Sequence, residues 1–239
     1  MTKEELAKSI EYTLLKPTVT GEMIVRLCGE ARQYHFACVA VNLCWVPLCA
    51  KLLKGSGVSV CTGIGFPLGT TATAIKVEET RLAIAQGANE VDVVINIGRV
   101  KEGDWKYVQD ELAAIAAVAK PAAVKSATAK PDVVKPATTL KVILETCYLT
   151  DAEKVEVCKA ALACGADYVK TSTGFGTAGA KVEDVRLMRA TVGSRMKVKA
   201  SGGIKTLDDA LALLDAGAVR LGTSSGVSIM EEFERRAGN

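Results

Sequence analysis

Short apolar runs alternate with helical patterns along most of the chain. Each run is apolar at successive positions, which is typical of strands buried on both faces of a parallel sheet. Between the runs, apolar residues recur every three or four positions, as in amphipathic helices. The pattern predicts strands at 10–14, 36–41, 58–62, 90–95, 140–144, 167–170, 197–200 and 219–222.

One phrase recurs where a predicted helix meets a strand. It reads "QGANEVDVV" from residue 86, "CGADYVKT" from residue 164 and "AGAVRLGT" from residue 216. In each copy, a glycine placed to end a helix precedes a run rich in β-branched residues. Two of the preceding helices also begin with a capping box, "TLDD" and "TDAE". The repeat therefore predicts alternating helices and strands.

Eight strand–helix units in 239 residues predict a single (β/α)8 barrel domain over 1–239. A doubly wound open sheet is the alternative, but it usually has fewer strands. Residues 119–139, "AKPAAVKSATAKPDVVKPATT", break the rhythm, because three prolines forbid a continuous helix. This Pro/Ala/Lys-rich stretch follows a helix and precedes a strand. We expect an exposed, mobile insertion on the N-terminal face of the barrel.

Polar residues gather at the C-terminal ends of the predicted strands. In a barrel, these ends carry the catalytic groups. The apolar first halves and polar tips recur too often for solvation alone to explain them. The polar residues here are Thr13, Lys16, Asn42, Asp92, Asn96, Glu145, Lys170 and Lys199, together with "GFPLG" and "GTSS".

Side-chain alternation along the strands predicts which charged groups share the barrel interior. If Asp92 faces inward, so do Val94 and Asn96; Lys170 would share its face with Tyr168 and Ser172. The resulting interior sets Asp92 and Glu145 against Lys141, Lys170 and Lys199, with Lys197 deeper.

An excess of buried lysines over acids favours one lysine with a lowered pKa, as a Schiff-base nucleophile requires. A second ammonium group ~5 Å away, at an effective dielectric constant of ~20, costs roughly 3 kcal/mol or about 2.4 pKa units. Burial would add to this effect. A buried ion network without chemistry is the alternative, and the arithmetic does not say which lysine reacts.

Two glycine-rich loops point to an anion. "SGGIKT" (201–206) follows the seventh predicted strand, and "GTSSGVS" (222–228) follows the eighth and opens a helix. Glycines let backbone amides approach a ligand, and a helix N-terminus favours negative charge. Loops after the last two strands are the usual phosphate site of a barrel.

Composition and charge limit the partners, the cellular compartment and the cofactors that the protein is expected to have. The net charge of +3, from 30 basic and 27 acidic residues spread along the chain, calls for neither nucleic acid nor a membrane surface as partner. The N-terminus does not resemble a signal peptide, and the chain has no run of 18 apolar residues. Eight cysteines within apolar segments, never as C-x-x-C, indicate reduced thiols of a cytoplasmic protein. With His35 as the only histidine, we expect no metal and no cofactor.

Together the motifs resemble one family, the deoxyribose-phosphate aldolases. The resemblance covers nearly the whole chain and is specific, because the motifs occur in family order. They are "IEYTLLKP", "VAVN", "CTGIGFPLGTT", "EVDVVINIG", "LKVILET", "YVKTSTGFG", "VKASGGIKT" and "LGTSS". The family joins acetaldehyde to D-glyceraldehyde 3-phosphate, reversibly and without metal, to give 2-deoxy-D-ribose 5-phosphate. The resemblance therefore implies small sugar-phosphate and aldehyde substrates.

The resemblance also implies roles for particular residues. Lys170 would form the imine, Lys199 would lower its pKa, and Asp92 would shuttle protons through water. The phosphate and the sugar would rest on the loops after the last three strands. The residues implied there are Thr173, Gly174, Gly202, Gly203, Gly222, Ser224 and Ser225.

Three departures from the family pattern bear on rate and acceptor range. Glu11 and Tyr12 stand where the common pattern has Asp-His, and Ala40 and Leu43 replace a frequent cysteine and proline. The chain also ends at "RRAGN" without the C-terminal tyrosine that some members use. None of these changes is expected to touch Lys170, Lys199 or Asp92, so the reaction class is expected to hold. The oligomeric state stays open, with a homodimer or homotetramer among the alternatives.

Two rival functions share the fold. A transaldolase-like enzyme or a sugar-phosphate isomerase would also bind phosphate in these loops, but an isomerase needs no reactive lysine. A catalytically silent barrel kept as a binding protein would normally lose a site residue. All three, Lys170, Lys199 and Asp92, are present.

Overall fold

The computed structural model describes residues 1–120 and 137–238. Eight parallel strands close into one barrel in chain order, because β1 pairs with both β2 and β8. The strands are β1 (Ile10–Leu14), β2 (Cys38–Val41), β3 (Ser59–Ile64), β4 (Glu90–Val94), β5 (Thr139–Ile143), β6 (Tyr168–Lys170), β7 (Lys197–Ser201) and β8 (Arg220–Thr223). The predicted (β/α)8 barrel is confirmed, and the open-sheet alternative is wrong.

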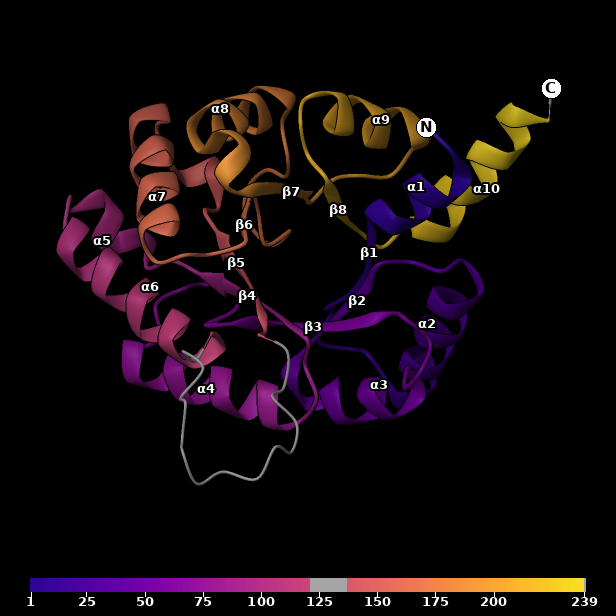
Figure 1. Ribbon diagram of the computed structural model, residues 1–239, viewed down its shortest axis with the longest axis horizontal. Coiled ribbons are helices and arrows are strands. Elements are labelled where there is room, and N and C mark those ends of the chain that lie inside the picture. Colours follow the sequence, from indigo (N-terminus) through magenta and orange to yellow (C-terminus); the bar gives the residue numbers. More distant parts are fainter. Residues whose placement is uncertain (121–136, 239) are drawn as a thin grey trace, which may run out of the picture.

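Helices form a ring outside the strands (Figure 1). They are α1 (Lys3–Ser9), α2 (Gly21–Gln33), α3 (Val46–Leu52), α4 (Thr73–Ala85), α5 (Ile97–Lys101), α6 (Trp105–Ala119), α7 (Asp151–Ala163), α8 (Val182–Val192), α9 (Leu207–Asp215) and α10 (Gly226–Ala237). Helix α1 precedes the first strand and lies beside α10, and it was not predicted from the sequence. The two predicted capping boxes are present at the starts of α7 and α9.

The hydrophobic core lies between the strands and the helices. The outward side chains of the strands are mostly valine and leucine, such as Val91 and Val93 of β4, and they are fully buried. The inner face differs, because small residues of β2 and β3 face charged residues of β4 to β7. A separate small cluster of Ala40, Cys38 and Cys61 marks this inner surface. The barrel therefore encloses a polar centre within an apolar shell.

The predicted insertion falls largely on residues 121–136, which lie outside the described residues. Its two flanks are described. α6 ends at Ala119, β5 begins at Thr139, and the amide of Thr138 donates to the carbonyl of Ala119 at 3.0 Å. The flanks therefore meet directly at the N-terminal end of β5, the end remote from the predicted site.

Candidate active site

Three side chains from separate strands meet at the centre of the barrel. Lys170 of β6 and Lys199 of β7 are Cα partners in the strand register. Their ammonium groups donate to the same carboxylate oxygen, Oδ2 of Asp92 in β4, at 2.8 and 2.7 Å. All three side chains are at most 5% exposed. The structure therefore brings together the three residues that the sequence singled out.

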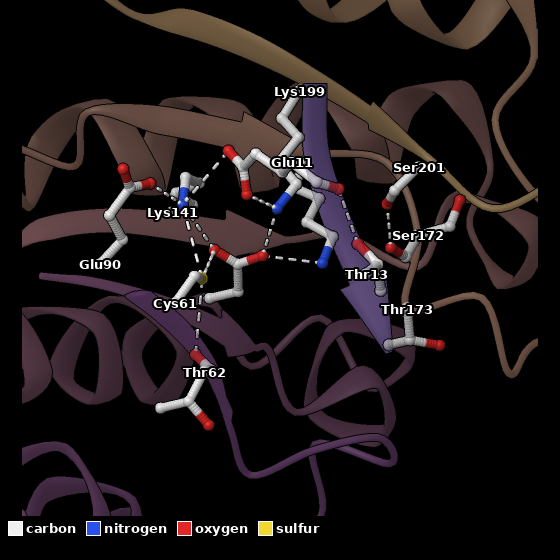
Figure 2. Close-up of polar contacts among 12 residues, drawn as sticks. Glu11, Thr13, Cys61, Thr62, Glu90, Lys141, Ser172, Thr173, Lys199 and Ser201 are labelled. Carbon is white, nitrogen blue, oxygen red and sulfur yellow. Dashed lines mark hydrogen bonds and ion pairs between the residues drawn. The ribbon is translucent and has the colours of Figure 1, made fainter. Parts of the chain in front are cut away.

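A second layer of charge lies beside this group (Figure 2). The ammonium group of Lys141 donates to Oδ1 of Asp92 at 3.0 Å, lies 3.5 Å from a carboxylate oxygen of Glu11, and forms an ion pair with Glu90. Lys199 also forms an ion pair with Glu11. Three lysines thus face three carboxylates. Two of these carboxylates, Glu11 and Glu90, were not predicted to lie in the interior. The expected excess of lysines over acids is wrong for this cluster.

Two residues do not lie where the alternation argument put them. Glu145 does not pair with the lysines; its carboxylate accepts from the amide and the hydroxyl of Thr173. The backbone of Glu145 has a φ of 54°, which ends the regular alternation of β5 and redirects the side chain. Lys197 is the first residue of β7 and is exposed, with its ammonium group 5.5 Å from the ring centroid of Tyr168. It therefore lies at the opposite end of the barrel from the strand tips.

Lys170 has a pKa below the usual lysine value. Burial is the largest cause, since removing an ammonium group from water disfavours its charged form. The charge of Lys199 lowers the pKa of Lys170 further, while Asp92 opposes both effects. The neighbouring ammonium group that the sequence suggested as the main cause is thus secondary to burial. Lys170 is the lysine of this cluster suited to act as a neutral amine.

The two other lysines have the opposite shift. Burial alone would lower the pKa of Lys199, but Asp92 and Glu11 outweigh it and raise that pKa above its usual value. In Lys141 burial is likewise outweighed, chiefly by Asp92, and the pKa is raised. Burial would raise the pKa of Asp92, but the three lysines hold it well below its usual value. At neutral pH the centre therefore holds an ionised aspartate, two ammonium groups and one amine with weakened basicity.

One group of side chains has the composition of a metal site. Within the described parts of the chain, Glu11, Cys38 and Cys61 place ligand atoms within 4.8 Å of one another. Metal binding requires thiolates, but burial first, and then the hydrogen bond with Cys61, raise the pKa of the Cys38 thiol well above its usual value. The ammonium group of Lys141 lies 3.6 Å from the sulfur of Cys61. These donors and this adjacent cation do not suit a divalent metal.

The expected phosphate-binding residues come together in one sector of the barrel. Gly202 and Gly203 have φ values of 87° and 81° in the loop after β7, and Gly174 follows β6. The segment before α8 packs tightly on this loop, since a Cβ on Gly179 would collide with the carbonyl of Gly202. Gly222 lies in β8, and Ser224 and Ser225 lead into the N-terminus of α10. The loops of three consecutive strands therefore lie side by side at the C-terminal end of the barrel.

Thr173 lies in the expected loop after β6, but its polar groups are bonded within the protein. Its hydroxyl donates to Glu145 and accepts from the amide of Phe175 at 3.0 Å, and its own amide donates to Glu145 at 3.2 Å. Both polar groups are thus used within the protein, beside a carboxylate that would repel an anion. Among the described residues, the buried hydroxyl of Ser172 has no hydrogen-bond partner (Figure 2). Ser172 is therefore a better donor for a ligand than Thr173.

Several buried charges were not predicted from the sequence. Glu90 lies two residues before Asp92 on the same strand face, so alternation alone could have found it. Lys76 of α4 and Glu111 of α6 form a fully buried ion pair at 2.9 Å, and Lys76 also donates to the carbonyl of Val94 at 2.8 Å. No sequence signal distinguished this pair from surface charges. It fixes the C-terminal end of β4, the strand that carries Asp92.

Two of the departures from the family pattern lie in different environments. The hydroxyl of Tyr12 donates to Glu30 of α2 at 2.8 Å, and its ring packs edge-to-face on Phe36. Tyr12 therefore faces the helices. Ala40 belongs to the small cluster of the inner face, and Glu11 is part of the charged centre. Glu11 and Ala40 therefore lie on the inner face, whereas Leu43 lines a hollow with Gly65 and Phe66. The expectation that no replacement touches Lys199 is wrong, because Glu11 forms an ion pair with it.

A closed barrel with an amine of lowered pKa beside an aspartate, and with glycine-rich loops at the same end, has the architecture of a carbonyl-activating enzyme that works through lysine. The model of the DeoC/LacD family aldolase matches residues 12–232. The chain belongs to this family of aldolases.

No helix in the described parts of the chain is long and apolar enough to cross a membrane.

Individual relatives are similar over nearly their full lengths. The chain is 50% identical to a deoxyribose-phosphate aldolase of Carboxydothermus hydrogenoformans, over 95% of this chain and 94% of that protein. It is 52% identical to one of Bacteroides thetaiotaomicron, over 97% and 91% of the two chains. A solved structure from Aeropyrum pernix, described as a tetrameric deoxyribose phosphate aldolase, has a TM-score of 0.85 and 33% identity, covering 98% and 92% of the two chains.

Proposed function

We propose that this aldolase reversibly cleaves 2-deoxy-D-ribose 5-phosphate into D-glyceraldehyde 3-phosphate and acetaldehyde, through a Schiff base on Lys170 and without a metal ion. The names of the similar aldolases support the substrate. The observation that carries the mechanism is the environment of Lys170, whose lowered pKa favours the neutral amine that attacks a carbonyl group.

Lys170 attacks the aldehyde carbon of the open-chain sugar, and loss of water gives the imine. The proton then leaves the hydroxyl of the third carbon, the bond between the second and third carbons breaks, and its electrons flow into the protonated imine. Glyceraldehyde 3-phosphate departs and leaves an enamine. Protonation of the enamine at its terminal carbon and hydrolysis release acetaldehyde and restore the amine.

Asp92 is the proposed proton shuttle, acting through water. Because the neighbouring lysines hold the pKa of Asp92 well below its usual value, its carboxylate stays ionised and orients both a water molecule and the amine of Lys170. Lys199 supplies a permanent positive charge that weakens the basicity of Lys170 and stabilises the carboxylate. Lys141 neutralises the far side of this aspartate.

The substrate phosphate is proposed to rest on the loops after β6, β7 and β8. Gly174, Gly202, Gly203 and Gly222 allow a close approach of the backbone, and Ser224 and Ser225 precede α10. The start of this helix offers free amide groups and the positive end of the helix dipole. Thr173 supports this loop through Glu145.

The test is coupled release of glyceraldehyde 3-phosphate from deoxyribose 5-phosphate, measured with and without a chelator. Equal rates are expected, and dependence on an added divalent ion would refute the metal-free mechanism. Borohydride trapping with acetaldehyde separates the aldolase from a sugar-phosphate isomerase, which forms no imine. A scaffold protein would neither trap acetaldehyde nor release product.

Assembly and location follow as parts of the same proposal. We expect a cytoplasmic enzyme that forms a homo-oligomer, supported by the reduced-thiol pattern of the sequence and by the tetrameric relative from Aeropyrum pernix. All eight cysteines, which lie in the described residues, are free thiols. Light scattering of the purified protein would test the assembly, and fractionation of the source cells would test the location.

A further inference from the structure

The thiol of Cys61 is a fourth hydrogen-bond donor to Asp92, beside the three lysines. Its sulfur lies 3.1 Å from Oδ1 of Asp92 and 3.6 Å from the ammonium nitrogen of Lys141 (Figure 2). An ammonium group can only donate, and an ionised carboxylate can only accept. The sulfur therefore accepts from Lys141, and its single hydrogen is directed to Asp92. The other acceptor within reach, the carbonyl of Thr62, is farther away at 3.9 Å.

Strand β3 reaches Asp92 through Cys61 because of the register between β3 and β4. The Cα partner of Asp92 in β3 is Gly63, which has no side chain, and the partner of Glu90 is Cys61. Side chains alternate along a strand, so Thr62 lies on the opposite face from Cys61. Cys61 therefore approaches Asp92 from the layer below, on the side of the N-terminal end of the barrel.

Four donors fill the hydrogen-bonding positions of the Asp92 carboxylate. Cys61 and Lys141 donate to Oδ1. Lys170 and Lys199 donate to Oδ2. The two oxygens of a carboxylate offer about four lone-pair positions. The last side-chain torsion of an aspartate has a broad energy profile, so the carboxylate itself resists rotation only weakly. The orientation of Asp92 therefore depends on these donors.

Lys141 by itself is a poor anchor for Oδ1 of Asp92. Its ammonium group also forms an ion pair with Glu90, lies 3.5 Å from Glu11, and ends a flexible side chain. Cys61 has a short side chain and is 1% exposed, so packing fixes the position of its sulfur. Among the described residues, Asp92 is the only carboxylate that accepts from this thiol. Cys61 is therefore the more rigid of the two anchors.

We infer that Cys61 is a positioning residue, whose thiol holds Oδ1 of Asp92 and thereby keeps Oδ2 facing the amine of Lys170. This inference rests on the proposed function and adds to it a residue that acts through Asp92. The thiol forms no bond with the substrate, and the proton of the donor's α-carbon still moves through water and Asp92. Without the thiol the carboxylate can turn, and the water that it orients is no longer aligned with the α-carbon.

The test measures two steps in the same variants: exchange of the methyl protons of acetaldehyde with deuterated water, and borohydride trapping of the imine. Cys61→Val removes the donor and fills the space of the side chain, and Cys61→Ala removes the same donor without adding volume. In both, exchange should slow by about tenfold or more, as expected for a misaligned group beside the reacting atoms, while trapping stays within about twofold of wild type. Cys61→Ser keeps a donor and should restore exchange to within about threefold of wild type.

Cys158→Val is the matched control, because Cys158 is equally buried but lies in α7, outside the strands. It makes the same substitution without touching Asp92 and should leave exchange unchanged. Equal exchange in the folded Cys61→Val and Cys158→Val variants, with melting curves as the check on folding, overturns the inference while the aldolase function stands. Exchange as slow in Cys61→Ser as in Cys61→Val also overturns it, because packing would then be the cause. A wild-type protein that traps no acetaldehyde overturns the proposed function and the inference together.

Discussion

Lys170 and Lys199 are direct neighbours in the register of two parallel strands, and their ammonium groups share one oxygen of Asp92. The two lysines nevertheless differ in pKa. Burial and the charge of Lys199 lower the pKa of Lys170, whereas Asp92 and Glu11 overcome burial and raise that of Lys199. Glu11 accounts for the difference in pKa between the two lysines, because its carboxylate contacts Lys199 and not Lys170. Position relative to one glutamate thus separates the proposed nucleophile, Lys170, from a lysine held as a cation.

Replacing Lys199 by leucine should make Lys170 more basic. Loss of the neighbouring positive charge raises the pKa of Lys170, so a smaller fraction is neutral at pH 7. The alkaline-rising limb of the rate profile should move to higher pH, with partial recovery of activity there. Lys199→Arg keeps the charge and should leave the position of the limb nearly unchanged. Identical profiles for the leucine variant and wild type would contradict this role.

Asp92→Asn should separate imine formation from proton transfer. Because Asp92 raises the pKa of Lys170, its neutralisation lowers that pKa further and leaves the amine available. Borohydride trapping of acetaldehyde should persist, while exchange of the methyl protons of acetaldehyde with deuterated water should slow by about 100-fold or more. Exchange at the wild-type rate would show that another group moves the proton.

Ser224→Asp should place a negative charge beside the substrate phosphate. Repulsion should raise KM for deoxyribose 5-phosphate by about tenfold or more and leave KM for deoxyribose nearly unchanged. Ser194→Asp introduces the same charge at an exposed position just before β7, at the other end of the barrel, and serves as control. Equal effects of Ser224→Asp on the two substrates would place the phosphate elsewhere.

Residues 121–136 should be removable without loss of catalysis. The flanks already meet, since the amide of Thr138 donates to the carbonyl of Ala119 at 3.0 Å, so a short Gly/Asn connection can close the chain. Cleavage of deoxyribose 5-phosphate should stay within about twofold of wild type. A folded variant with activity reduced more than about tenfold would mean that this segment contributes to the site.

The sequence predicted the barrel well because hydrophobic periodicity is local information. Both ends of the first strand, Ile10–Leu14, were predicted correctly. The ends of the other strands were predicted to within about two residues. Alternation also identified the faces of Asp92, Lys170 and Lys199. It failed for Glu145, because a left-handed backbone conformation at the strand end redirects the side chain.

Pairing between distant charges could not be predicted from the same signal. Alternation assigns a side chain to a face but not to a depth in the barrel, so Lys197 was placed with the interior lysines although it is exposed. Glu11 pairs with Lys199 only because closure brings β1 beside β8, next to β7. Such contacts depend on strand register and tilt, which the pattern of apolar residues does not contain.

The most direct test of the mechanism is peptide mapping of the borohydride-reduced acetaldehyde adduct in the wild-type protein. The lowered pKa of Lys170 predicts that the added mass lies on Lys170, and that Lys170→Ala abolishes both the adduct and nearly all turnover. Lys199 and Lys141, whose pKa values are raised, should carry no label. A label on Lys199 or Lys141 would contradict the assignment of the nucleophile.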